Sequence, residues 1–382
     1  MGYLLQFASG SIIYILFINY SIASDFNTTN TSLKWEEVST ELYNDEKLKC
    51  SDGSDYKFYF KKGSENLLIF FSGGGACWDY DTCNSHNKSY PIKTYENKTD
   101  LKYNKPGHWK GLLDLDNSNN PIKDWSILFL PYCSADLHIG NKIKYYSKEN
   151  RKIKIYHNGY NNINFALNWM KKNKIDSFNK TIVSGSSSGG YGAMFNFSLI
   201  KKKINSKSFI VVSDAADGVI SKDFTENVFI KSSTPWNATI SLEKTTNKNN
   251  SIIDYFDHII KQNKDTKFLS FSSDWDVMQI LFFNIMSKDT ENWLDINKEV
   301  KMQWNFIANQ HKKRLLKNDN YFLKNYNGCI HSGLRYDDVF YNKNNSINEW
   351  LNSFNEVNDK QKLPSEKEFL NCFNRAIFSV KE

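Results

Sequence analysis

The sequence has little that would break it into separate domains. It holds only 6 prolines and 18 glycines in 382 residues, and no stretch rich in proline, glycine and serine marks a linker. Hydrophobic residues make up 40% of the chain and charged residues 24%. This composition can bury a full core and argues against wholesale disorder. We therefore expect residues 25–382 to form a single domain with loop insertions.

Long apolar runs are absent after the N-terminus. Residues 11–19 form an apolar stretch that is too short to favour a membrane span. Small residues follow at Ser21, Ala23 and Ser24, as a signal-peptidase site requires. Residues 1–24 are therefore predicted to be the signal peptide of a secreted protein, with no stable membrane insertion after cleavage. No lysine or arginine precedes the apolar stretch, and an uncleaved membrane anchor is the alternative.

No Cys-x-x-Cys pair occurs, and the nearby histidines lack the spacing of metal ligands, so the sequence argues against a metal site. An even number of cysteines after a signal-like start predicts three disulfides instead, and their pairing stays open. The cysteines are Cys50, Cys77, Cys83, Cys133, Cys329 and Cys372. The candidate glycosylation sites, which matter only in a eukaryotic host, include Asn27, Asn30, Asn97, Asn196 and Asn237.

The basic residues do not form a nucleic-acid surface. Net charge is +7, and the densest basic runs are 201–203 and 311–314. Each run lies near an apolar helical pattern and lacks the interleaved aromatic residues of a stacking platform. We therefore interpret these runs as solvated helix faces and expect no nucleic-acid partner.

Short apolar runs alternate with helical patterns along the chain. The runs cover residues 56–60, 66–71, 125–130, 181–184, 209–212, 268–271 and 321–326. Helical spacing is found over 161–172, 191–200, 252–260 and 277–286, and in a basic stretch that ends at residue 316. This alternation predicts an α/β fold, with a mostly parallel sheet and helices on both faces. Residues 25–50 and 84–123 are polar, and we expect irregular structure and loops there.

The clearest catalytic pattern is Gly-x-Ser-x-Gly at residues 185–189, where Ser187 is the central residue. It lies directly between an apolar run and a helical pattern, which is the strand–turn–helix setting of the nucleophile elbow in α/β-hydrolases. The flanking glycines let the backbone turn sharply. Ser187 is therefore the candidate nucleophile, and the backbone N–H of Ser188 is a candidate donor to an oxyanion.

A serine nucleophile needs a base and an acid, which follow it in the order acid, then histidine, in α/β-hydrolases. His331 follows the last apolar run and is the better base, because His311 lies within the basic helical stretch. Asp274 and Asp276 both follow the run at 268–271. Either could orient the imidazole, and position alone leaves the choice between them open.

A second glycine-rich turn, Ser-Gly-Gly-Gly-Ala at residues 72–76, ends the run at 66–71. Backbone N–H groups in such a turn can converge on a developing oxyanion. A phosphate-binding loop is the alternative, but the Gly-Lys-Ser/Thr continuation and the Gly-x-Gly-x-x-Gly spacing are both missing.

Further segments complete a specific combination of motifs. They are residues 72–79, 82–83, 131–140, 157–162, 185–190, 276–279 and 329–331. Among them are Ser-Gly-Gly-Gly-Ala-Cys-Trp-Asp, Pro-Tyr-Cys-Ser-Ala-Asp-Leu-His-Ile-Gly, Asp-Val-Met-Gln and Cys-Ile-His. Together they cover most of residues 66–335 and resemble the pectin acetylesterase and Notum family.

The resemblance implies roles for individual residues. It places the nucleophile at Ser187 and favours Asp276 over Asp274, because the family's acid precedes a glutamine by three residues, here Gln279. It implies oxyanion donors at the backbones of Gly74, Gly75 and Ser188. It also implies the disulfides Cys77–Cys83 and Cys50–Cys133, which leaves Cys329–Cys372. The chain departs from the family at Ser188, where alanine is usual.

The sequence and the resemblance together predict a secreted serine carboxylic ester hydrolase. It would remove acyl groups, with acetyl expected, from a polysaccharide through an acyl-enzyme formed by Ser187, His331 and Asp276. Three alternatives remain open: a deacylase of a lipidated protein, another acyl-transfer enzyme such as a peptidase or thioesterase, and a non-catalytic secreted binding protein on the same fold. We expect a monomer that needs no cofactor and no metal.

Overall fold

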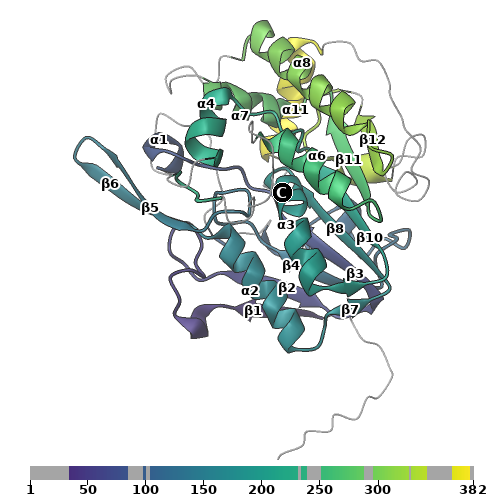
Figure 1. Cartoon of the computed structure of the whole chain (residues 1–382). Helices are drawn as coiled ribbons and strands as arrows, with labels where there is room; N and C mark the ends of the chain where they lie inside the picture. Colours follow the sequence, from purple (N-terminus) through teal and green to yellow (C-terminus); the bar gives the residue numbers. More distant parts are fainter. Residues whose placement is uncertain are drawn as a thin grey trace, which may run out of the picture. The chain divides into compact units, whose positions relative to one another are not determined.

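The apolar runs of the sequence become the strands of one eight-stranded sheet in the computed structural model (Figure 1). The structure describes residues 34–84, 98–99, 104–230, 234–238, 251–287, 296–326, 328–341 and 364–378. The described residues all belong to one compact unit. The predicted signal peptide and the sequons at Asn27, Asn30 and Asn97 lie outside the described residues.

The sheet is mixed, with a parallel majority. Its strand order is β1 (Trp35–Ser39), β2 (Lys57–Lys61), β4 (Trp125–Leu130), β3 (Ser64–Phe71), β8 (Lys180–Ser186), β10 (Phe209–Asp214), β11 (Lys267–Ser273) and β12 (Tyr321–Tyr326). The pairs β1–β2 and β2–β4 are antiparallel, and every other neighbouring pair is parallel. The carboxyl ends of six parallel strands therefore meet at one edge, where the glycine-rich turn, the elbow and the candidate acid and base follow four of them.

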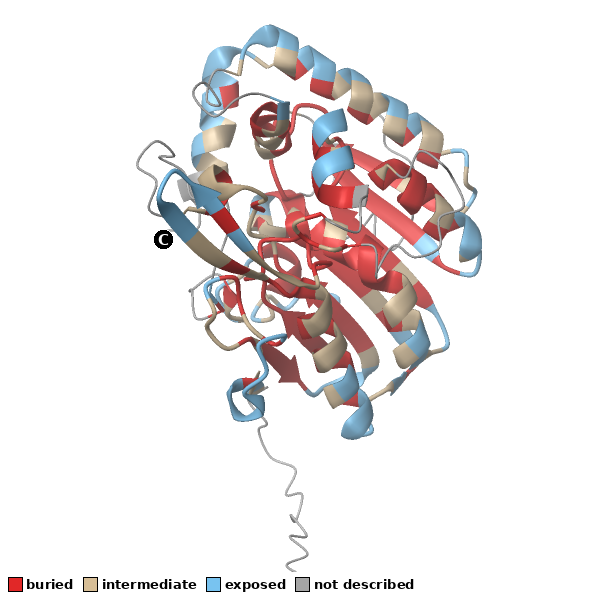
Figure 2. Ribbon diagram, turned by 60° about the vertical axis from the view of Figure 1, so that its left-hand side comes forward, coloured by how far each residue is buried: buried red, intermediate tan, exposed pale blue. Residues whose placement is uncertain are grey.

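The sheet is buried on both faces (Figure 2). Successive side chains of a strand point to opposite faces, and β3 shows this alternation. Its Leu67, Ile69 and Phe71 pack with α2 (Gly159–Lys172), α3 (Ser188–Lys203) and α6 (Ile252–Gln262). Its Leu68 and Phe70 pack with shorter segments on the other face: η3 (Gly111–Leu113), η5 (Gly333–Arg335) and α9 (Asp337–Phe340). Burial on both faces explains why β3 reads as an unbroken apolar run.

A smaller core forms around the buried Trp304, which belongs to α8 (Lys298–Leu315). Side chains of α7 (Val277–Ser287) and α11 (Glu366–Phe378) complete this core. The remaining short elements are η1 (Glu41–Tyr43), α1 (Tyr80–Cys83), β7 (Ser177–Phe178), β9 (Asn205–Ser206), α4 (Lys222–Phe224) and the π-helical turn η4 (Thr225–Ile230). Among the described residues, no helix has the length and hydropathy that crossing a membrane requires.

Several elements were not expected from the sequence, and two of them, β1 and a hairpin, show why. Strand β1 lies within the stretch 25–50 that polarity predicted to be irregular, and it forms because it pairs with the free edge of β2. A hairpin of β5 (Lys142–Lys148) and β6 (Arg151–His157) extends from the body of the molecule (Figure 1). Its Tyr146 and Ile155 pack against the Cys77–Cys83 disulfide. Both elements depend on contacts between distant parts of the chain, which local composition does not report.

The six cysteines form three disulfides: Cys50–Cys133, Cys77–Cys83 and Cys329–Cys372. These are the pairs that the family resemblance implies. The sequon at Asn196 is buried, with its side-chain amide donating to the carbonyls of His138 and Gly192. Asn196 is therefore inaccessible to glycosylation in the folded chain, whereas Asn237, the other described sequon of the five named above, is half-buried and stays a candidate.

Candidate active site

Ser187 lies at a sharp turn between β8 and α3. Its backbone adopts φ 59° and ψ −129°, a conformation that is strained for a residue with a side chain. The turn is held because Ser187 N–H donates to the carbonyl of Asp214 at 2.8 Å. A Cβ atom on Gly185 would lie 2.2 Å from the carbonyl oxygen of Gly189, and one on Gly189 would lie 2.0 Å from that of Phe71. Only glycine fits at both positions, so the elbow motif follows from the tightness of the turn.

Asp276 and His331 are in direct contact, although 55 residues separate them in the sequence. His331 Nδ1 lies 2.8 Å from Asp276 Oδ1 and 3.0 Å from Oδ2, and both side chains are buried. The Asp276 carboxylate also accepts the backbone N–H groups of Met278 and Gln279 at the start of α7. Held in this way, the carboxylate fixes the ring orientation of His331 and leaves Nε2 available.

The two other residues considered for the triad lie elsewhere. Asp274 Oδ1 is 3.4 Å from Lys312 Nζ, so Asp274 belongs to a separate ion pair. His311 Nδ1 contacts the carbonyl of Asp217 at 2.9 Å. Burial lowers the pKa of His311 below its usual value. The contact with each other therefore favours Asp276 and His331 over Asp274 and His311 as the acid and the base.

The glycine-rich loop at residues 72–76 packs directly on the elbow. A Cβ atom on Gly73 would lie 2.9 Å from Ser187 Cβ. Gly74 N–H donates to Ser188 Oγ at 2.8 Å, which joins the loop to the first residue of α3. The N–H of Ser188 lies in the first helical turn, where backbone donors have no acceptor within the helix. Gly75 and Ser188 line the same pocket as Ser187.

This pocket has a volume of about 60 Å³ and a mostly apolar lining. Ser187 and His331 lie on its wall together with Gln279 and Tyr191. The apolar side chains around them are Trp78, Leu137, Val219, Ile220, Phe224, Trp236, Met278, Phe282 and Met286. Trp236 is fixed in this wall, because its indole N–H donates to the carbonyl of Cys77 at 2.8 Å. A hydrocarbon group that enters the pocket meets both the candidate nucleophile and the candidate base.

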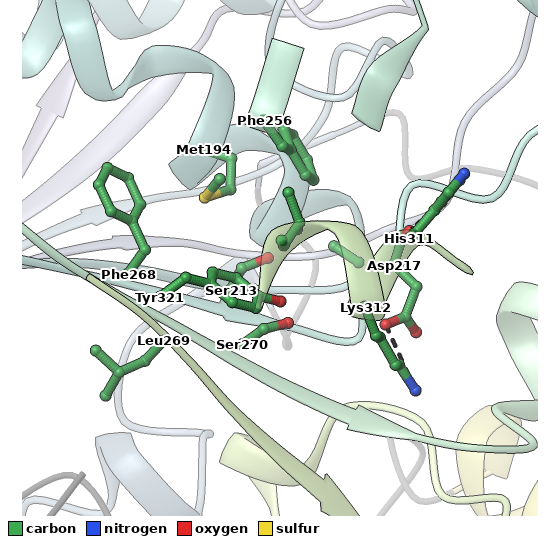
Figure 3. Close-up of a pocket in the computed structure, with 12 residues that line it drawn as sticks. Met194, Ser213, Asp217, Phe256, Phe268, Leu269, Ser270, His311, Lys312 and Tyr321 are labelled. Atoms are coloured by element: carbon green, nitrogen blue, oxygen red, sulfur yellow. Dashed lines mark hydrogen bonds and ion pairs between the residues drawn. The ribbon is translucent and has the colours of Figure 1, made fainter. Parts of the chain in front are cut away.

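A buried polar network lies behind the candidate acid. Gln279 Nε2 donates to Asp276 Oδ2 at 3.1 Å and to Asp217 Oδ2 at 2.8 Å, and Gln279 Oε1 accepts Asp217 N–H. Lys312 Nζ lies 3.9 Å from Asp217 Oδ1 and faces Asp274 as well. Lys312 and Asp217 line a cavity of about 10 Å³ together with Ser213, Ser270 and Tyr321. Figure 3 shows these side chains. Gln279 therefore links the candidate acid to a buried ion pair.

The interpretation of the basic run 311–314 as a solvated helix face was wrong for Lys312. This side chain is buried because it faces two buried carboxylates, those of Asp217 and Asp274. Burial raises the pKa of Asp274, and the neighbouring Lys312 opposes that shift. One sequence signal could have indicated this buried ion pair. Asp217 and Asp274 follow the strands β10 and β11, at the edge of a parallel sheet where functional residues gather.

Within the described part of the chain, one group of side chains has the proximity that a metal ion needs: Cys77, Cys83 and His157. The two sulfur atoms are bonded to each other, so they cannot act as thiolate ligands. His157 is instead hydrogen-bonded to Tyr146 Oη through Nε2 at 2.9 Å and to the carbonyl of Ser134 through Nδ1 at 3.1 Å. These residues stabilise the base of the hairpin.

Comparisons with known proteins find similarity over most of the chain. A family model described as Pectinacetylesterase matches residues 31–366. Palmitoleoyl-protein carboxylesterase NOTUM of Schmidtea mediterranea is 25% identical over 170 residues, which cover 43% of this chain and 30% of that protein. Pectin acetylesterase 4 of Arabidopsis thaliana is 26% identical over 149 residues, which cover 36% and 35%. The alignments thus span about a third of the length of the curated relatives.

A solved structure, that of the Wnt deacylase Notum from Drosophila, is similar over most of the chain. Its TM-score is 0.57, and the alignment covers 87% of this chain and 97% of that one at 17% sequence identity. This likeness shows the α/β-hydrolase-like fold.

Proposed function

The chain belongs to the pectinacetylesterase family, and on this premise we propose that it is a serine carboxylic ester hydrolase. The observation that carries the proposal is the contact of Asp276 with His331 beside a pocket that also contains Ser187. Ser187 is the nucleophile, His331 the general base and acid, and Asp276 the residue that orients the imidazole.

The reaction follows the acyl-enzyme route. Ser187 Oγ attacks the carbonyl carbon of the ester while His331 Nε2 takes the hydroxyl proton. Backbone N–H groups of Gly74, Gly75 and Ser188 stabilise the negative charge on the carbonyl oxygen. His331 then gives its proton to the leaving alcohol, and the acyl group stays on Ser187. A water molecule, deprotonated by His331, releases the carboxylic acid and restores the serine.

The pocket supports an acyl chain longer than acetyl. An acetyl group has a single methyl to bury, whereas many large apolar side chains line the pocket, and each further methylene that leaves water contributes about 0.8 kcal/mol to binding. Two relatives represent the two kinds of substrate by their names. One is the palmitoleoyl-protein carboxylesterase NOTUM, and the other is pectin acetylesterase 4. We place this chain nearer the first, as a deacylase of a lipid-modified substrate. An acetylated polysaccharide is the second candidate, which the family name supports.

Secretion belongs to the same proposal. Three disulfides form and persist in an oxidising compartment, and the predicted signal peptide would direct the chain there. An extracellular esterase would act on acylated protein or acylated polysaccharide outside the cell.

A series of p-nitrophenyl esters from acetyl to palmitoyl tests the proposal. We expect kcat/KM to rise with chain length over several carbons and to be lost in Ser187→Ala. Ser184→Ala is the matched control, because Ser184 lies on β8, the strand that precedes the elbow, and its hydroxyl has no hydrogen-bond partner among the described residues. Maximal activity on the acetyl ester would favour the polysaccharide candidate. Folded wild-type protein without activity on any ester or thioester would contradict the proposed function.

A further inference from the structure

Asp214 is a buried carboxylate that the reaction described above does not use. It ends β10 and has no exposed surface. Its Oδ2 accepts hydrogen bonds from Ser186 Oγ at 2.7 Å and from Leu334 N–H at 3.0 Å. Its Oδ1 accepts Gly333 N–H at 3.1 Å. One side chain therefore receives three donors from two separate segments.

These donors lie beside two members of the candidate triad. Ser186 immediately precedes Ser187, and Gly333 and Leu334 follow His331 by two and three residues. The main chain of Asp214 adds a fourth bond, because its carbonyl accepts Ser187 N–H at 2.8 Å. The elbow and the histidine loop are therefore bonded to one residue, although the sheet places β10 and β11 between β8 and β12.

The loop after His331 is shaped to reach this carboxylate. Ser332 adopts φ 66° and ψ 73°, a left-handed conformation that turns the chain sharply after the histidine. Such strain persists only where the surroundings hold it. The two N–H groups that follow the turn both point at Asp214, so the carboxylate compensates the strain and fixes the backbone that carries His331.

Electrostatics reinforces the geometry. Burial raises the pKa of Asp214 to about 6, while its hydrogen bonds and the nearby charge of His331 favour the ionised form. The Asp214 carboxylate thus interacts with the charge of His331, the residue that Asp276 also contacts. It therefore stabilises the imidazolium that forms when His331 takes the proton of Ser187.

We propose that Asp214 is a positioning residue, which sets the separation between Ser187 and His331 by holding both loops. The proposal rests on the proposed function and adds to it a fourth side chain that acts through Ser187 and His331. It predicts that loss of the carboxylate slows acyl transfer without weakening substrate binding, since the pocket lining is untouched.

The test compares Asp214→Asn with Asp136→Asn. Asp136 is a matched control: it is buried and also accepts one serine hydroxyl, that of Ser134, and two backbone N–H groups, those of His138 and Gly159. Each substitution replaces a carboxylate oxygen with an NH₂ group that cannot accept, and both should lower the thermal midpoint. The readouts are kcat and KM on a p-nitrophenyl ester and the rate of fluorophosphonate labelling per folded molecule.

We expect Asp214→Asn to lower kcat and the labelling rate by about 10- to 100-fold, the cost of misplacing reacting groups, with KM within about twofold. Asp136→Asn should stay within about threefold of wild type in kcat. If Asp214→Asn does not fold, Ser186→Ala removes one of the three bonds and should lower kcat about fivefold, the loss of one hydrogen bond.

Unchanged kcat in a folded Asp214→Asn variant would overturn the positioning role while leaving the esterase proposal intact. An equal fall of kcat in Asp136→Asn would assign the effect to general destabilisation and would also overturn it. If only Ser186→Ala folds, a kcat equal to that of the wild type would overturn the positioning role of Asp214. A wild-type protein that is folded but inert would instead remove the proposed function, and the positioning role with it.

Discussion

The backbone N–H of Gly74 donates a hydrogen bond to the side chain of Ser188, at 2.8 Å. The donor belongs to the glycine-rich loop, and the acceptor immediately follows Ser187. The N–H of Gly74 is one of the three donors that we assign to the oxyanion site, and in this structure it already donates to a side-chain oxygen of the protein. The chain carries this hydroxyl where the related family usually has alanine.

Ser188→Ala should therefore increase the rate of acylation. Removal of the hydroxyl frees the Gly74 N–H for the oxyanion, and a hydrogen bond of about 1 kcal/mol corresponds to a factor of about five. The measurement is kcat on a short p-nitrophenyl ester, with Ser184→Ala as the control for loss of a buried hydroxyl. A fall of kcat in Ser188→Ala would mean that the hydroxyl itself helps to stabilise the oxyanion.

Lys312→Met should strongly destabilise the fold. The substitution leaves the buried carboxylates of Asp217 and Asp274 without their cation, and breaking a buried ion pair in this way costs about 3 kcal/mol or more. The adjacent Lys313 is exposed, so Lys313→Met is the matched control and should leave the free energy of unfolding unchanged within about 0.5 kcal/mol. Urea denaturation of the two variants gives the comparison, and equal stabilities would show that the buried pair contributes nothing.

His157 should make the fold sensitive to acid. Burial lowers the pKa of His157 to about 3. Between pH 6.5 and pH 3 the imidazole is therefore protonated in the unfolded chain but neutral in the folded chain. The contribution of neutral His157 to the free energy of unfolding is therefore complete above pH 6.5 and is lost as the pH falls toward 3. Relative to His157→Gln, the wild type should lose about 3 kcal/mol between pH 7 and pH 4. A difference in free energy of unfolding that does not change with pH would contradict this assignment.

Much of the fold could be predicted from the sequence, because its strands are buried on both faces. Such strands read as mostly apolar runs, and the run 125–130 coincides with β4. The strand predicted at 321–326 coincides with β12, which lies at the edge of the sheet. The candidate catalytic residues could be predicted for a related reason. In a parallel sheet, motifs that follow different strands meet at one edge. Position along the chain then indicated Ser187 and His331.

The remainder depends on contacts between segments that are distant in the sequence. Strand β1 forms only against the edge of β2, and Lys312 is buried because it faces two carboxylates from other elements. The convergence of Ser186 and Gly333 on Asp214 joins residues that are more than a hundred positions apart along the chain. No local pattern reports such hydrogen bonds, so the supporting residues of the site emerge only from the folded structure.

The most direct test of the central claim is labelling of the purified protein by a fluorophosphonate probe, beside Ser187→Ala and Ser184→Ala. The probe reacts only with a serine whose hydroxyl is activated by a neighbouring base. We predict that the wild type and Ser184→Ala are labelled and that Ser187→Ala is not. Folded wild-type protein that stays unlabelled, or Ser187→Ala that is labelled as fast as the wild type, would contradict the assignment of Ser187 as the nucleophile.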